Sequence, residues 1–168
     1  MAVSDKIMLG EGIVSVGGTA IGLTRGGSVF KVEREIRNIE ADGDRGGVKG
    51  RVVIDSEVAK LTVNALDMFT AADMVKYYPG IAITAITGGS SMTGTLTIAA
   101  GDYVAVTFVG KTKDGKAVTI SLVDALNLAN IEWALEDKSE VVSEIEFTSH
   151  YDETARNTAP WSVLFATA

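Results

Sequence analysis

The chain has 168 residues, of which 46% are hydrophobic, and this is enough for one domain with a packed core. It contains no cysteine, which excludes disulfide frameworks, zinc–thiolate sites and cysteine nucleophiles. The formal net charge of −7 disfavours general binding of nucleic acid, because the chain repels phosphates.

Alternating apolar and charged residues predict a strand over residues 28–38. Phe30, Val32 and Ile36 share one face, which we expect to be buried. The other face, which we expect to be charged and wetted, carries Lys31, Glu33, Glu35 and Arg37. Arg34 interrupts the apolar face, which suggests a sheet edge or a subunit contact there.

Residues 48–55 and 60–66 follow as two more strand candidates, and the second has Leu61, Val63 and Ala65 on one face. A short helix is then predicted. Thr70 can cap it, with Asp73 three residues later. The expected apolar stripe of this helix is Ala71, Met74, Val75 and Tyr78, and Pro79-Gly80 ends it. Residues 81–101 match no element that we can assign.

Residues 103–110 and 116–122 are predicted to form a hairpin around Asp114-Gly115. Residues 124–130 fit either a helical turn or a loop, and 131–137 (IEWALED) are a further strand candidate. Residues 139–152 place Val141, Ile145 and Phe147 opposite Glu144, Glu146, Thr148 and His150. Residues 161–165 form a last short strand. The sum predicts a single domain over residues 1–168, mainly β, as a β-sandwich or small barrel with one short packed helix.

The glycine-rich loop IEADGDRGGVKG (residues 39–50) invites a ligand-binding interpretation, but known motifs do not fit. Lys49 is misplaced for a phosphate loop, and no helix follows. Asp42 and Asp44 lack the further oxygen ligands of a calcium loop. Residues 10–15 (GEGIVS) begin like a dinucleotide fingerprint, but Ser15 replaces the third glycine and no βαβ unit follows.

No catalytic constellation is predicted. Ser149 and His150 would point to opposite faces of an extended chain, so with Asp152 they would not form a hydrolase triad. His150 is the only histidine. The pairs Glu33/Glu35 and Glu144/Glu146 lie side by side and would not flank a substrate bond. Trp133 and Trp161 are expected in the core or a subunit interface. We therefore expect no enzyme, cofactor or metal site; an enzyme with an unrecognised site would rest on His150 and the carboxylate pairs.

The run GGTAIGLTRGGSVFKVEREIRNIEADGDRGGVKG, then KLTVNAL, then a short helix ending in YYPG, resembles the tail tube (major tail) proteins of long-tailed bacteriophages. The strand EIEFTSHYD adds to this resemblance, which covers roughly residues 8–166. It implies a β-sandwich flanked by a helix, and six-subunit rings that stack into a tube for DNA and the tape-measure protein. It also implies contacts with tail terminator or tip proteins, synthesis in the host cytoplasm and a place in the virion tail.

The resemblance and the charge pattern together give two expected surfaces. The loop is expected to reach a neighbouring subunit through Asp42, Asp44, Arg45, Gly46, Gly47 and Lys49. The candidate lumen or wetted face consists of Lys31, Glu33, Glu35, Arg37, Glu144 and Glu146. DNA is expected to pass without specific binding, and no membrane insertion is expected. Two alternatives stay open: a carbohydrate-binding β-sandwich module, and a subunit of another phage-derived tube such as a contractile injection particle.

Overall fold

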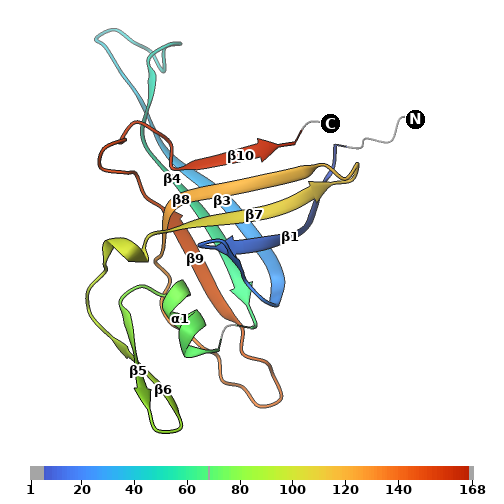
Figure 1. Cartoon of the computed structure of the whole chain (residues 1–168). Coiled ribbons are helices and arrows are strands. Elements are labelled where there is room, and N and C mark those ends of the chain that lie inside the picture. The colour runs from blue at the N-terminus through green and yellow to red at the C-terminus, as the bar shows by residue number, and fades with distance from the viewer. Residues whose placement is uncertain (1–5, 68, 167–168) are drawn as a thin grey trace.

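The computed structural model describes residues 6–67 and 69–166. The strands of its large sheet are β1 (Met8–Val16), β2 (Thr19–Ala20), β3 (Thr24–Asn38), β4 (Val52–Ala65), β7 (Val104–Thr112), β8 (Ala117–Asn127), β9 (Ser143–Ser149) and β10 (Trp161–Phe165). Their order is β2-β1-β7-β8-β9-β4-β3, with β10 beside β8, and all these pairings are antiparallel (Figure 1). Strands β5 (Ile81–Ile86) and β6 (Gly89–Gly94) form a separate hairpin. With the helix α1 (Ala71–Tyr77) and the 3-10 turn η1 (Ala100–Asp102), these elements confirm the predicted mainly β fold with one short helix.

The large sheet folds over itself at β8. This strand pairs with β7 on one side, and on its other side first with β10 and then with β9. Strand β9 continues the sheet to β4 and β3. The β10 end of the sheet therefore lies over the β3–β4 end, where the rings of Phe30 and Trp161 are 5.9 Å apart. The side chains between the two ends, among them Leu61, Val63 and Phe147, form the hydrophobic core.

Helix α1 closes one end of this core. The Thr70 side chain accepts a hydrogen bond from the backbone N–H of Asp73, at 3.2 Å, as the capping pattern predicts. Met74, Tyr77 and Tyr78 are buried, whereas Val75 is 39% exposed, so the predicted stripe was wrong in including Val75. The buried face of the helix carries Tyr77 where the prediction has Val75, and the chain leaves α1 at Tyr78 with an extended backbone.

Two side-chain hydrogen bonds fix the end of α1 to the sheet. The Asn127 side-chain amide donates to the Tyr77 carbonyl at 2.7 Å, and both partners are buried. The Tyr78 hydroxyl lies 2.6 Å from the Ser143 hydroxyl, also in the interior. Buried polar groups without partners are costly, so these bonds explain how polar atoms are tolerated in the core.

Several predicted elements differ from the structure. Residues 48–55 and 60–66 are not two strands, because β4 runs unbroken from Val52 to Ala65 and residues 48–51 belong to the loop. Residues 124–127 extend β8, so the helical-turn option for 124–130 is wrong. Residues 131–137 are not a strand. Strand β1 and the β5–β6 hairpin are not among the predicted elements. None of the helices in the described part of the chain has the length and apolar character to cross a membrane.

Candidate assembly surface

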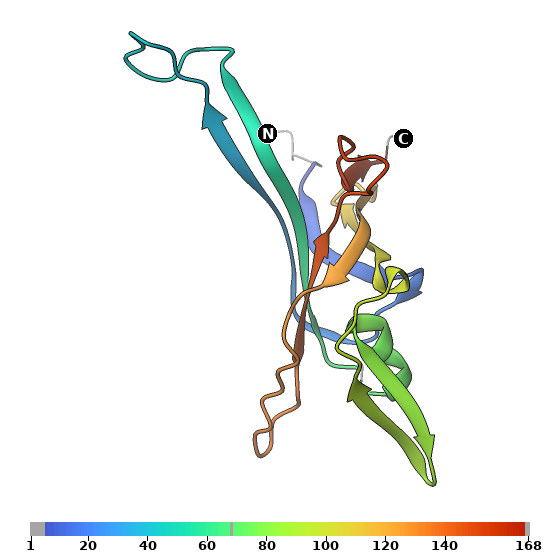
Figure 2. The same cartoon turned by 90° about the vertical axis from the view of Figure 1, so that its left-hand side faces the viewer.

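The outer parts of β3 and β4, with the loop between them, form an arm (residues 34–57) that extends away from the rest of the molecule (Figure 2). The arm projects because both strands are longer than the rest of the sheet requires: β3 has 15 residues and β4 has 14. Strand β9 pairs with β4 only from Lys60 to Ala65. Beyond that point the two strands are paired only with each other in the described structure.

One face of the arm continues the core face of the sheet into solvent. Phe30 and Val32 pack against the core, and Ile36 follows on the same side of β3. A bulge at Asp55 shifts the register, so that Ile36 pairs with Ile54 and Asn38 with Val52. Ile36, Ile54 and Val52 are 61%, 55% and 53% exposed. We call these three residues the apolar strip of the arm.

The loop at the tip of the arm is held by hydrogen bonds within its own chain. The Asp44 carboxylate accepts hydrogen bonds from the Ala41 backbone N–H, at 2.8 Å, and from the Arg51 guanidinium, at 2.7 Å. Gly43 has φ of +93°, a conformation that other L residues seldom adopt. Of the predicted contact residues, Asp44 is therefore held within its own chain. Exposed positions at the tip are Asp42, Arg45, Gly46, Gly47 and Lys49.

Three residues anchor the base of the arm to the C-terminal strand. Arg34 and Glu57 are directly opposite each other on β3 and β4 and form an ion pair. The indole N–H of Trp161 donates to the other carboxylate oxygen of Glu57 at 2.6 Å. Two hydrogen bonds lower the pKa of Glu57 below its usual 4.5: the bond from Trp161 has the larger effect, and the bond from Arg34 has the smaller one. The interruption of the apolar face by Arg34 is thus explained by a contact inside the chain.

Charged side chains of β3, β4 and β9 form an ionic network. Lys60 lies between Glu33, at 3.2 Å, and Glu146, at 3.6 Å, and Lys31 also pairs with Glu33. Hydrogen bonds from Lys31 and then Lys60 lower the pKa of Glu33. The alternation of β4 places Lys60 on the polar side of the strand, but it does not indicate which carboxylates Lys60 meets.

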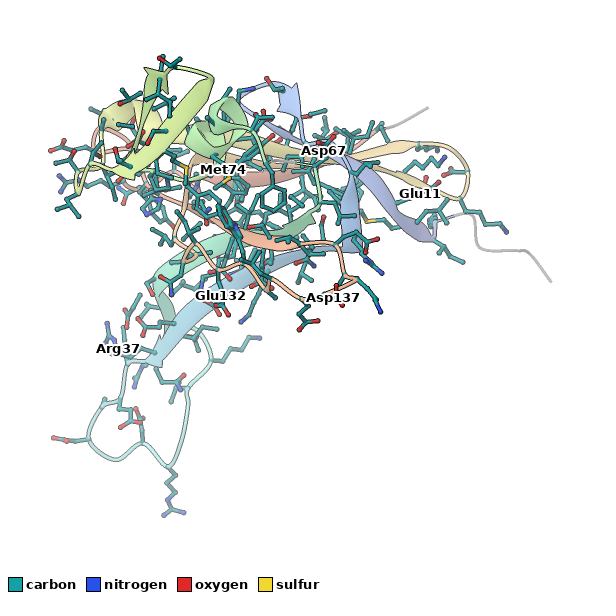
Figure 3. All side chains as sticks on the ribbon, turned by 90° about the horizontal axis from the view of Figure 1, so that it is seen from below. Glu11, Arg37, Asp67, Met74, Glu132 and Asp137 are labelled. Atoms are coloured by element: carbon teal, nitrogen blue, oxygen red, sulfur yellow. The ribbon has the colours of Figure 1, made fainter. Side chains whose placement is uncertain are left out.

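The remaining predicted residues of this face lie on either side of that network. Arg37 pairs with Asp55 on the arm, through nitrogen–oxygen distances of 2.8 and 3.1 Å (Figure 3 labels Arg37). Glu35 accepts from the Ser56 hydroxyl at 3.0 Å. Glu144 lies two residues before Glu146 on β9 and outside the Lys60 pairs. The face carries carboxylates and cations in a ratio of five to three: Glu33, Glu35, Asp55, Glu144 and Glu146 against Lys31, Arg37 and Lys60.

Residues 128–142 leave the sheet between β8 and β9 and form a second projection, at the end of the molecule opposite the arm tip (Figures 1 and 2). A hollow of about 500 Å³ separates this segment from β9 and is lined by Glu132, Glu144 and Glu146, among others. Trp133 is 36% exposed and meets Phe69 edge to face, with ring centroids 5.5 Å apart. Arg25 and Glu140 form an ion pair of 2.9 Å.

Ser149, His150 and Asp152 each contact a neighbouring residue of the fold. The Ser149 hydroxyl is buried and accepts from the Ala59 backbone N–H at 3.2 Å. The His150 ring meets Tyr103 edge to face at 5.2 Å. Asp152 accepts hydrogen bonds from Thr154. Across residues 6–67 and 69–166, no group of three or more histidine or acidic side chains is arranged to hold a metal ion.

Several strands of the large sheet have an open side in the described structure, among them β4 from Val52 to Ala59. Strand β3 ends the sheet order, so its outer side is unpaired from Thr24 to Asn38. Strand β2 covers β1 only at Ser15 and Val16. Strand β10 pairs only with β8. Open edges of this length are rare in monomeric proteins, because they offer a template for another chain.

Comparisons with known proteins are sparse. No protein-family model matches the chain, and no curated protein sequence matches it. Among solved structures, the chain is similar to one described as "Virion of native gene transfer agent (GTA) particle". That similarity has a TM-score of 0.48 and 10% sequence identity, and it covers 93% of this chain and 95% of that one.

Proposed function

We propose that this chain is a structural subunit of a virion tail, which assembles with its own copies into hexameric rings that stack into a tail tube. DNA and the tape-measure protein would pass through the tube, and terminator and tip proteins would close its ends. The role is structural and not enzymatic. The observation that carries the proposal is the arm, which exposes an apolar strip and the open edge of β3 at a distance from the molecule's own core.

The arm leaves the apolar side chains of Ile36, Val52 and Ile54 exposed to water in a single subunit. Burying apolar side chains stabilises a protein by roughly 25 cal/mol for each Å² removed from water. The apolar strip gains none of this in an isolated subunit, although β3 and β4 stay paired along the whole arm. A neighbouring copy would cover Ile36, Val52 and Ile54 and pair with the edge of β3. The sequence resemblance to tail tube proteins supports the same assembly.

The charges fit a conduit for DNA. Six copies carry a formal charge of six times −7, or −42. The wetted face of β3, β4 and β9 is acidic, with Glu144 and Glu146 adding to the balanced set Lys31, Glu33, Glu35 and Arg37. A lumen lined by this face would repel phosphates, so that DNA would pass without binding.

The test is assembly of the purified protein. Electron microscopy and sedimentation over a concentration series should reveal rings or tubes about 100 Å wide, an estimate from packing six small domains. Removing Asp42–Gly47 should leave the circular dichroism spectrum of the subunit nearly unchanged and impair tube formation.

A chain that stays monomeric at every concentration, together with no labelling of phage tails by its antibody, would overturn the proposal. Normal tubes from the deletion variant would reject the part of the argument that concerns the loop. A subunit of another phage-derived tube, such as a contractile injection particle, would assemble in the same way, and labelling of such particles would identify it.

A further inference from the structure

The segment Ile131–Asp137 has the sequence of a strand but no partner strand. Ile131, Trp133 and Leu135 alternate with acidic or small residues, as in a strand with one apolar face. In the part of the chain that the structure describes, these residues pair with no other strand. Ile131 is 47% exposed and Leu135 is 78% exposed. A strand-like sequence that remains unpaired and apolar in the subunit is a candidate for pairing in an assembly.

The chain's own sheet does not accept this segment. Strand β8 leaves β9 after Asn127, and the last contact is the Leu128 backbone N–H to the Glu146 carbonyl, at 3.2 Å. Beyond it, Glu132 faces Glu144 and Glu146 across the hollow. Like charges on facing strands oppose pairing, which explains why the segment is held off β9. Figure 3 shows Glu132 and Asp137 on this segment, apart from Arg37 on the arm.

Charge identifies which open edge would accept the segment. Ile131–Asp137 carries three carboxylates and no cation: Glu132, Glu136 and Asp137. The open part of β1 carries only Glu11, and β10 has no charged residue. Beyond Arg25, which pairs with Glu140 of its own chain, strand β3 carries three cations against two carboxylates: Lys31, Arg34 and Arg37 against Glu33 and Glu35. The ion pairs of Lys31 and Arg37 are solvent-exposed and therefore weak, so these cations can take new partners.

The accepting edge is the outer half of β3, beyond the Arg25–Glu140 contact inside the chain, and it must belong to another molecule. The outer half of β3 lies on the arm, and the segment lies at the opposite end of the same chain (Figure 2). We infer that Ile131–Asp137 is a donor strand that pairs with the open edge of β3 in a second copy of this chain. The inference rests on the proposed self-assembly and names the contact that joins neighbouring subunits. Donor and acceptor are different surfaces, so the contact is head-to-tail and can close into a ring.

Cysteine crosslinking tests this pairing directly, since the native chain has no cysteine. Leu135→Cys protein is mixed with single variants of the β3 edge, Lys31→Cys, Glu33→Cys or Glu35→Cys, and oxidised under assembly conditions. A crosslinked dimer with at least one of these variants is expected, and the position that reacts best gives the register. Crosslinking that instead prefers Ile13→Cys on β1 or Val163→Cys on β10, or that occurs with none of them, would overturn the inference.

A second variant separates this inference from the proposed function. Leu135→Lys should raise the protein concentration needed for assembly by about tenfold or more, because a contact that buries a leucine is lost. Leu96→Lys is the matched control, since Leu96 is fully exposed in a different loop, and it should assemble like the wild type. Equal assembly of both variants and the wild type would reject the donor strand and leave the proposed function intact. A wild-type chain that never assembles would reject both.

Discussion

The indole N–H of Trp161 donates a hydrogen bond of 2.6 Å to the carboxylate of Glu57. Glu57 lies on β4 at the base of the arm, two residues after the bulge at Asp55, and Trp161 begins the final strand. The Glu57 side chain is only 13% exposed, so this bond and the ion pair with Arg34 are partly shielded from water. The C-terminal strand is thereby joined to the base of the arm.

Replacing Trp161 with phenylalanine should keep the contact with Phe30 but remove this hydrogen bond. We expect the free energy of unfolding to fall by about 1–2 kcal/mol, the usual cost when a charged acceptor loses its donor. Urea unfolding followed by circular dichroism measures the change. Ser162→Ala, at the exposed neighbouring position, is the control and should unfold like the wild type. Indistinguishable unfolding of all three proteins would contradict the role given to this bond.

The pKa of Glu57 gives a prediction for acid conditions. Its folded pKa lies below the usual 4.5, so the folded state favours the carboxylate. The resulting stabilisation is present above pH 4.5 and is lost as the pH falls through the lowered folded pKa. Stability should therefore decline less steeply below this pH in Glu57→Gln than in the wild type. Unfolding curves at a series of pH values test this; Glu40→Gln, on the exposed tip loop, should keep the wild-type slope.

Gly12 is required by the close approach of Phe108. A Cβ atom at Gly12 would lie 2.4 Å from the Phe108 ring and 2.7 Å from the Val109 carbonyl oxygen. Gly12→Ala should therefore reduce the free energy of unfolding by about 1–3 kcal/mol, as overpacking does. Gly10→Ala is the matched control on the same strand, because a Cβ there meets nothing within 4 Å. If both variants melt at the same temperature, the steric explanation fails.

The apolar strip makes a prediction that separates folding from assembly. Ile54→Ser changes a side chain that is 55% exposed, so we expect unfolding within about 0.5 kcal/mol of the wild type. Tube formation should require a higher protein concentration, since the proposed assembly would bury this residue between subunits. Val109→Ser, at a 43% exposed position on β7, is the control. Tubes that form equally well from both variants would show that the strip is not an interface.

Local patterns predicted many of the elements. The alternation of Leu61, Val63 and Ala65 correctly predicted a buried strand face, and all three are buried. Thr70 and Asp73 correctly predicted the helix start, because a cap depends only on neighbouring residues. The alternation of residues 131–137 is as regular, but pairing depends on what faces the segment, and here Glu144 and Glu146 do.

Contacts between residues that are far apart in the chain could not be predicted from the local sequence patterns. Lys60 joins Glu33 and Glu146, and nothing local in those three stretches indicates that they meet. The bulge at Asp55 was likewise missed, so the exposed pairing of Ile36 with Ile54 was not anticipated. The predicted loop contacts and lumen face stay predictions, since they concern neighbouring copies.

The bulge at Asp55 also limits how the arm can change in length. Side chains alternate along each strand, so inserting one residue into both strands just beyond the bulge would turn Ile36 and Ile54 to the charged face. Inserting two residues into each strand would restore the facing and lengthen the arm by about 7 Å. The length of the arm can therefore change only in steps of two residues per strand, and in the proposed assembly the spacing between subunits would change in the same steps.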